Sequence, residues 1–320
     1  MKILVASPLD PGALETLRAT HDVALAIGAS EDDLARAVLD REAIVFRSGV
    51  SLSTRVLDSA PALRLLVRAG SGLDNLDLAT VRTRGIVLER VPGPGAQAVA
   101  ELTFGLMLGL ARQIVVADRA WRDGHWLKSE LKGYNLRGKT LGVIGLGSIG
   151  TRVAELGQAW SMTVIGCVDR YDEDRRRGFA ERGIELLADC DAVLRRADFL
   201  SIHVPLGEAT RGLIADRELA LMKPGAFLVN IARGGVVDEA ALRDALVAGR
   251  LAGAALDVHA AEGEGRISPL ADLPNVILTP HIGATTVDAQ REIGEIVVQI
   301  VDRYAHATRE PELVTTRGSE

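Results

Sequence analysis

Short apolar runs alternate with amphipathic stretches along most of the chain. Five such runs lie in the first 93 residues, beside segments with helical spacing such as 31–39 and 53–60, and they cover 3–7, 23–27, 43–46, 63–67 and 86–91. Runs of this length between helical segments predict β-strands joined by α-helices. Strands that alternate with helices form parallel sheets, so the pattern favours an α/β fold.

The alternation is interrupted once and then resumes. Proline and glycine break it at VPGPGA (91–96), and a long helical segment follows from about Ala96 to Gly124. We interpret this break as a crossing between two domains. Six further apolar runs cover 140–145, 163–168, 199–204, 226–232, 252–258 and 275–280. With helices between them, they predict a second parallel sheet that is covered on both faces.

Composition agrees with a two-domain globular protein. The 320 residues of the chain are enough for two domains of about 150 residues each. A net charge of −6 and an aromatic content of 3% argue against nucleic acid as a partner. The N-terminal apolar run is too short for a signal peptide, and the most hydrophobic run, 102–111, is shorter than the about 20 residues that span a bilayer. We therefore expect a cytoplasmic protein that binds no membrane.

The cysteines and two glycines lead to further expectations. Cys167 and Cys190 lack the spacing of metal ligands, which predicts buried free thiols in a reducing compartment and no metal site. Gly105 and Gly109 lie on one face of the helix predicted around 102–111. Small residues at this spacing let a second helix approach closely, so we expect a homodimer.

The strongest local motif is GLGSIG, residues 145–150. It follows a predicted strand and leads into a predicted helix, which is the context of a dinucleotide-binding loop. In such a loop Gly145 makes the tight turn, Gly147 lets the backbone approach a pyrophosphate, and Gly150 allows close packing of helix on strand. The helix that begins at Ser148 and Ile149 directs free N–H groups at the phosphates. The second sheet is therefore predicted to be a Rossmann domain.

The choice between NAD and NADP depends on the end of the next strand. Asp169 stands 19 positions after Gly150, where an acidic residue binds the ribose hydroxyls of NAD. Arg170 follows directly and is of the type that accepts the 2′-phosphate of NADP. The aspartate favours NAD.

Several polar residues follow consecutive strands of the second sheet. Pro205 follows one predicted strand, whose last residues are His203 and Val204, and Arg233 follows the next; Glu262 and His281 come after the two strands beyond. Ligands of such sheets bind outside the carboxyl ends of the strands, so the arginine, the glutamate and the second histidine are expected to share one edge.

Three segments carry a resemblance to a known family. NIARGGVVDEAAL (230–242), GAALDV (253–258) and NVILTPHIGATTVDAQ (275–290) resemble the signatures of the D-isomer-specific 2-hydroxyacid dehydrogenases. Within that family, RSGV (47–50), RAGSGLDNLDL (68–78) and AELTFGLMLGLARQI (100–114) are most similar to the D-3-phosphoglycerate dehydrogenases. The resemblance implies two Rossmann-like domains, one flavodoxin-like and one NAD-binding. We assign 1–93 with 285–320 to the substrate domain and 94–284 to the NAD-binding domain, with a cleft between them.

The resemblance also implies roles for individual residues. Arg233 is expected to bind the substrate carboxylate and carbonyl, and Glu262 to pair with His281. The backbone of Ala69, Gly70 and Ser71 is expected to hold the carboxylate, while Arg47 and Arg68 contact a distal phosphate. The residues expected to line the cofactor are Gly145, Gly147, Ser148, Ile149, Gly150, Asp169, His203, Val204, Pro205, Ile231, Ala232, Asp257, His281 and Gly283.

The residue types suit the reduction of a 2-keto acid. This reaction needs a hydride on carbon, a proton on oxygen and a clamp for the carboxylate. Arg233 offers a planar fork that fixes a carboxylate and polarises a carbonyl. His281 is suited to donate the proton, and a neighbouring Glu262 carboxylate favours its charged form.

Departures from the family pattern leave alternatives open. Val168 occupies the usual acidic position, Gly95 replaces an asparagine common in phosphoglycerate dehydrogenases, and Gly263 and His259 replace a proline and an aromatic residue around Glu262. The chain ends at residue 320, which predicts a short form without a C-terminal regulatory domain. The substrate is therefore expected to be 3-phospho-D-glycerate or a related phosphorylated or phosphonate acid. The alternatives are a non-phosphorylated acid such as glyoxylate or hydroxypyruvate, or an NADH-responsive corepressor-like scaffold.

Overall fold

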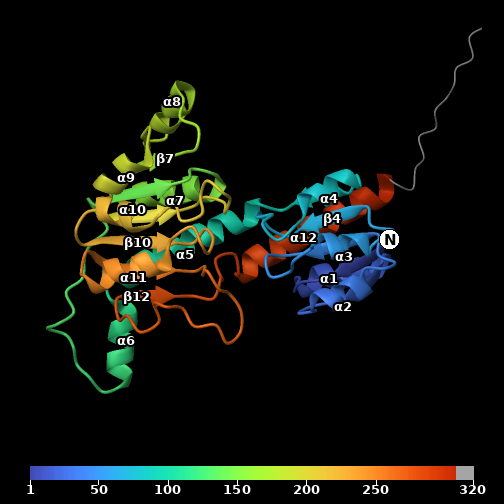
Figure 1. Ribbon diagram of the computed structural model, residues 1–320, viewed down its shortest axis with the longest axis horizontal. Helices are drawn as coiled ribbons and strands as arrows, with labels where there is room; N and C mark the ends of the chain where they lie inside the picture. The colour runs from blue at the N-terminus through green and yellow to red at the C-terminus, as the bar shows by residue number, and fades with distance from the viewer. Residues whose placement is uncertain (308–320) are drawn as a thin grey trace, which may run out of the picture. The chain divides into compact units, whose positions relative to one another are not determined.

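The chain divides into two compact units, which Figure 1 colours by residue number. The computed structural model describes residues 1–307. Unit 1 comprises Met1–Gly95 and the segment from Thr285 onward, and unit 2 comprises Ala96–Ala284. The expected boundary at 93/94 lies two residues before this division. Residues 308–320 of the predicted substrate domain lie outside the described residues.

Unit 1 is a parallel five-stranded sheet in the order β2-β1-β3-β4-β5, which is the flavodoxin-like order. Its strands are β1 (Lys2–Val5), β2 (Asp22–Leu25), β3 (Ala43–Phe46), β4 (Leu65–Arg68) and β5 (Val87–Arg90). Side chains of α1 (Pro11–Thr20) and α12 (Val287–Ala307) form the core on one face. Those of α2 (Glu31–Ala37), α3 (Thr54–Asp58) and α4 (Leu78–Thr83) form the core on the other.

Unit 2 is a parallel seven-stranded sheet in the order β12-β11-β10-β9-β6-β7-β8. Its strands are β6 (Thr140–Ile144), β7 (Thr163–Cys167), β8 (Glu185–Leu186), β9 (Phe199–Ile202), β10 (Ala226–Asn230), β11 (Leu251–Leu256) and β12 (Val276–Leu278). The predicted fold class is confirmed, but the prediction of six strands in this sheet omitted β8. That strand has two residues, only one of them buried, so it leaves no apolar run in the sequence.

Helices cover both faces of the unit 2 sheet. Side chains of α5 (Gly93–Ala111) and α7 (Ser148–Ala159) pack in one core with Val143 and Val229 of the strands. Side chains of α9 (Cys190–Arg196), α10 (Asp216–Leu221) and α11 (Glu239–Val247) pack in the other core. In Figure 1, α8 (Glu173–Glu181) lies at the end of unit 2 beside β7, and α6 (Ile114–Arg122) lies at the opposite end near β12.

The helix predicted from about Ala96 to Gly124 is broken. It ends at Ala111 and restarts at Ile114, because Gln113 adopts the left-handed conformation with φ of 53°. Gly109 is buried within the chain, where a Cβ atom would lie 2.8 Å from Ile277 Cδ1. Its lack of a side chain therefore serves packing inside unit 2. The homodimer stays a prediction.

No single helix among residues 1–307 has both the length and the apolar content to cross a membrane. The bent pair of α5 and α6, with 63° between the two helices, meets these two criteria only when both helices are counted together.

The prediction that both cysteines are free was wrong. Cys167, the last residue of β7, and Cys190, the first residue of α9, form a disulfide with their Cα atoms 5.6 Å apart. The sequence did not indicate this bond, because the two residues are 23 positions apart and meet only when α9 packs against β7. Disulfides are rare in reducing compartments. The cytoplasmic localisation stays a prediction that now lacks the support of free thiols.

Reduction of this disulfide is expected to lower the melting temperature. Closing a loop of this length removes unfolded-state entropy worth about 3 kcal/mol. Purified protein should show no reactive thiols when denatured without reductant, and its melting temperature should fall when reductant is added. In Cys190→Ser, the melting temperature should be low and insensitive to reductant. Two titratable thiols in the untreated protein would contradict the assignment.

Candidate active site

The glycine loop lies where the order of strands in the unit 2 sheet reverses. The chain runs outward from β6 through β7 to β8, and then returns to β9 on the other side of β6. In open sheets of this kind, ligands bind at this reversal, outside the carboxyl ends of the strands. Residues 145–150 follow β6 directly and lead into α7.

The local geometry requires glycine at two of the three glycine positions of the loop and leaves open space at the third. Gly145 has φ of +91°, and a Cβ atom there would lie 2.7 Å from the carbonyl oxygen of His203. At Gly150 a Cβ atom would lie 1.9 Å from the carbonyl oxygen of Gly145. At Gly147 it would meet no atom within 4 Å, and no side chain caps the N-terminus of α7. Open space beside uncapped N–H groups fits a pyrophosphate.

A cavity of about 810 Å³ adjoins this loop. It is lined by Asp169, two residues beyond β7, and by Arg175 of α8, whose Nη1 atom lies 3.6 Å from Asp169 Oδ1. Arg170 does not line the cavity and donates its backbone N–H to Asp169 Oδ1 over 2.9 Å. The basic side chain at this position is therefore Arg175, which the sequence analysis missed.

The segment after β9 forms another side of the same cavity. His203, Val204 and Pro205 all line it. Burial lowers the pKa of His203 to about 3, and its Nε2 atom lies 2.7 Å from the hydroxyl of the buried Ser201. His203 is thus neutral at physiological pH and unsuited to donate a proton in catalysis.

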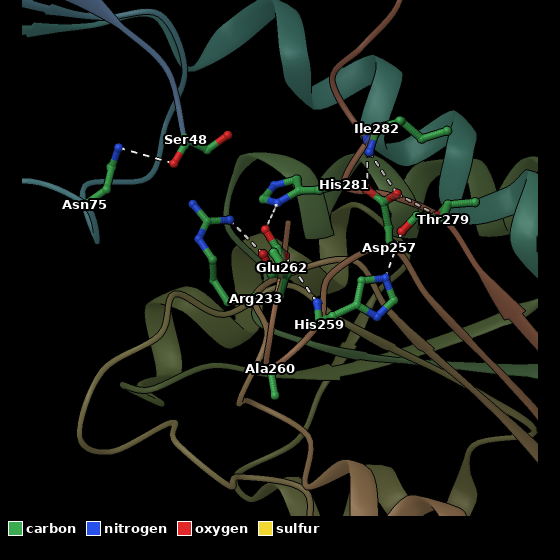
Figure 2. Close-up of polar contacts among 12 residues, drawn as sticks. Ser48, Asn75, Arg233, Asp257, His259, Ala260, Glu262, Thr279, His281 and Ile282 are labelled. Carbon is green, nitrogen blue, oxygen red and sulfur yellow. Dashed lines mark hydrogen bonds and ion pairs between the residues drawn. The ribbon is translucent and has the colours of Figure 1, made fainter. Parts of the chain in front are cut away.

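Glu262 and His281 form a direct pair. His281 Nδ1 and Glu262 Oε2 are 2.9 Å apart, and the backbone N–H of His259 donates to Glu262 Oε1 over 3.2 Å. Burial would raise the pKa of Glu262, but the hydrogen bond and positive charge of His281 outweigh it, so the pKa lies below its usual range. Glu262 is therefore an anion at neutral pH. Figure 2 shows its carboxylate between the side chains of His281 and Arg233.

The turn that carries His281 is held by Asp257. This buried carboxylate accepts the backbone N–H groups of Ile282 and Gly283 over 2.9 and 2.8 Å, and the hydroxyl of Thr279 over 2.6 Å (Figure 2). His281 itself has φ of 55°, a left-handed conformation that costs a non-glycine residue on the order of 1 kcal/mol. The three hydrogen bonds offset this cost and fix the direction of the imidazole.

Arg233 lies on a loop after β10 that packs tightly against the Glu262 loop. A Cβ atom at Gly234 would lie 1.8 Å from the carbonyl oxygen of His259, so only glycine fits there. The buried Asn230 accepts the N–H of Ala232 and donates to the carbonyl of Arg233. Ile231 and Ala232 are buried at the start of this loop. The arginine and the glutamate are thereby held at neighbouring strand ends.

His259 links the Glu262 loop to the His281 turn. Its Nε2 atom lies 2.9 Å from the carbonyl oxygen of Thr279, while Nδ1 is buried with no hydrogen-bond partner within residues 1–307. A cavity of about 490 Å³ lies beside the pair and is lined by His259, Glu262, His281 and Arg266, among others. Within the described part of the chain, no three His, Cys, Asp or Glu side chains are grouped so as to hold a metal ion.

The residues expected to contact substrate from unit 1 lie at the ends of β3 and β4. Arg47 Nη1 donates to Gln290 Oε1 over 2.6 Å, and burial lowers the pKa of Arg47. Arg68 is buried, donates from Nε to the carbonyl of Gly72 over 2.8 Å, and lies 5.7 Å from the centre of the Phe46 ring. Arg68 thus supports the loop formed by Ala69, Gly70 and Ser71.

Comparison with known proteins agrees with this geometry. The family model for the NAD binding domain of D-isomer specific 2-hydroxyacid dehydrogenases matches residues 104–283. The D-3-phosphoglycerate dehydrogenase of Methanocaldococcus jannaschii is 41% identical over 304 residues, covering 95% of this chain and 57% of that protein. The hydroxypyruvate reductase of Thermotoga maritima is 38% identical over 304 residues, covering 93% of this chain and 97% of that protein.

A solved structure extends the likeness to three dimensions. The D-lactate dehydrogenase from Aquifex aeolicus, crystallised with NAD and lactic acid, has a TM-score of 0.82 at 30% identity and covers 95% of each chain. The protein therefore belongs to the D-isomer specific 2-hydroxyacid dehydrogenase family, and the predicted resemblance is confirmed. Its unit 2 contains the NAD binding domain of that family, which supports NAD(H) as a cofactor. The chain spans little more than half the length of the phosphoglycerate dehydrogenases that it matches.

Replacing Asp257 by asparagine is expected to destabilise the protein and impair catalysis. The N–H groups that now donate to the Asp257 carboxylate would then face the NH₂ group of an amide, which cannot accept a hydrogen bond. A buried donor left unpaired in this way lowers the free energy of unfolding by about 1–3 kcal/mol. The free energy of unfolding in urea should fall by about this amount, and kcat/KM should fall because His281 is no longer fixed. Thr279→Val is the matched control, since it removes only one of the three donors and should cost less. Unchanged stability together with weaker NADH binding would instead assign the carboxylate to the cofactor.

Proposed function

We propose that the protein is an NAD(H)-dependent D-2-hydroxyacid dehydrogenase. The observation that carries this proposal is the Glu262–His281 pair, 2.9 Å apart, beside the loop that carries Arg233 (Figure 2). The cofactor, when bound, supplies or accepts a hydride at the carbon of the substrate. The protein residues position the substrate and move the proton on its oxygen.

Two side chains divide the remaining chemistry. Arg233 provides a planar fork for the carboxylate and polarises the carbonyl. His281 directs Nδ1 at Glu262, which leaves Nε2 as the atom that exchanges a proton with the substrate oxygen. Glu262 is a positioning residue that also stabilises the charged imidazole. In reduction Nε2 donates its proton, and in oxidation the neutral ring accepts one.

For the substrate, we propose 3-phosphohydroxypyruvate and 3-phospho-D-glycerate, or a related phosphorylated or phosphonate acid. Support comes from Arg47, whose half-buried guanidinium lies at the end of β3, and from the relatives named D-3-phosphoglycerate dehydrogenase. A non-phosphorylated acid is the second candidate. It is favoured by the engagement of Arg68 with its own loop and by the relative named hydroxypyruvate reductase.

A panel of 2-keto acids with NADH tests both candidates. Phosphohydroxypyruvate should be reduced with a higher kcat/KM than hydroxypyruvate, from which it differs by the phosphate. Arg47→Ala should lower kcat/KM for the phosphorylated acid by about tenfold or more, the scale of a lost charge-assisted hydrogen bond, and leave the other acid unaffected. Equal losses on both acids would contradict the phosphate role. Absence of turnover with every 2-keto acid would favour the scaffold alternative.

The pH dependence tests the role of the pair. Because Nε2 must carry a proton for reduction and none for oxidation, kcat/KM for reduction should fall as pH rises, while that for oxidation should rise. Glu262→Gln should move the inflection of the reduction profile to lower pH, since the anion that stabilises the imidazolium is lost. His281→Ala should lose about 100-fold or more in both directions and retain NADH binding. Near-normal reduction by His281→Ala would assign the proton to another group, with His259 the first to examine.

A further inference from the structure

The cavity beside the glycine loop is lined by residues of both charge signs. Asp169, Glu208 and Arg175 all line it. The aspartate alone predicts exclusion of NADP, because its charge repels a 2′-phosphate. Arg175 changes this electrostatic picture, since its Nη1 atom lies 3.6 Å from Asp169 Oδ1.

Arg175 is anchored close to Asp169 by its surroundings. Its backbone N–H is accepted by Asp172, the N-cap residue of α8, over 2.8 Å. Its Nη1 atom donates to the carbonyl of Arg170 over 3.0 Å, and its Nε atom lies 3.7 Å from Asp172 Oδ2. These contacts hold the guanidinium near Asp169, which lines the same cavity.

The Asp169–Arg175 pair is weak enough to exchange partners. The Asp169 side chain is 84% exposed and that of Arg175 is 46% exposed. Exposed ion pairs contribute little to stability, because water screens the charges and ordering the side chains costs entropy. A 2′-phosphate offers Arg175 a stronger acceptor, because bidentate guanidinium–phosphate bonds are among the strongest hydrogen bonds in proteins.

We propose that Arg175 is a specificity-determining residue that lets this cavity accept the 2′-phosphate of NADP(H) as well as the ribose diol of NAD(H). With NAD(H), the guanidinium stays beside Asp169, which takes the hydroxyls. With NADP(H), it turns to the phosphate and shields it from Asp169. The proposal rests on the cofactor role of the cavity and not on the choice of substrate.

Binding titrations without substrate test this role directly. The dissociation constants of NADH and NADPH are measured by their fluorescence, and those of adenosine 5′-monophosphate and adenosine 2′,5′-bisphosphate by competition. Arg175→Ala should weaken NADPH and the bisphosphate by about tenfold or more, and change NADH and the monophosphate by no more than about twofold. Arg175→Lys, which keeps the charge, should recover part of the loss.

Arg176→Ala is the matched control. Arg176 is the next residue of α8, but it pairs with Glu173 over 2.5 Å and does not line the cavity, so its loss should leave all four constants unchanged. A double-mutant cycle with Asp169→Ala distinguishes direct contact of Arg175 with the 2′-phosphate from neutralisation of the Asp169 charge by Arg175. If Arg175 contacts the phosphate, Arg175→Ala should still weaken NADPH when Asp169 is absent. Loss of the effect in that background, equal weakening of NADH and NADPH, or an unchanged NADPH constant in Arg175→Ala would each overturn the proposal.

Discussion

The geometry of the site depends on one buried carboxylate. Asp257 follows β11 directly and ties down the turn after β12 through two backbone N–H groups and one hydroxyl. Without this anchor, a histidine with φ of 55° would relax toward the conformations that L-residues prefer. The buried Asp257 thus holds the strained His281 at the edge of the sheet. Strain of this kind persists only where surrounding contacts determine it fully.

Three loops depend on this anchor in turn. The Glu262 loop is fastened to the same turn by His259 and Thr279, and the Arg233 loop fits against it only because residue 234 has no side chain. Each loop follows one of the adjacent strands β10, β11 and β12, whose register fixes the spacing between them. A displacement of the Glu262 loop would be transmitted to the other two through the close packing of Gly234 on His259 and the hydrogen bond between His259 and Thr279. The arginine, glutamate and histidine are thus positioned as a set.

The sequence predicted the features that follow from the periodicity of apolar residues. It did not predict the features that depend on contacts between segments distant in the chain. Apolar runs predicted eleven of the twelve strands within residues 1–307, and the glycine loop was correctly placed between a strand and a helix, with steric reasons for glycine at Gly145 and Gly150. β8 is too short to show a pattern, the break at Gln113 follows no glycine or proline, and the disulfide joins segments that have no sequence relation. In the site, the meeting of Glu262 and His281 was expected. Arg175 was missed because its approach to Asp169 depends on how α8 follows β7.

Catalysis and substrate selectivity also differ in how far overall similarity predicts them. Relatives named for phosphoglycerate and for hydroxypyruvate resemble this chain to a similar degree, at 41% and 38% identity, so overall similarity does not select between those two substrates. Selectivity must then come from side chains that the scaffold does not require. Arg68 is buried under its own loop and stacked on Phe46, so its replacement would disturb the backbone of that loop. Arg47 donates from Nη1 to Gln290 Oε1 of α12 over 2.6 Å. The two arginines thus differ in what they hold, since Arg68 contacts its own loop and Arg47 contacts a helix distant in the sequence.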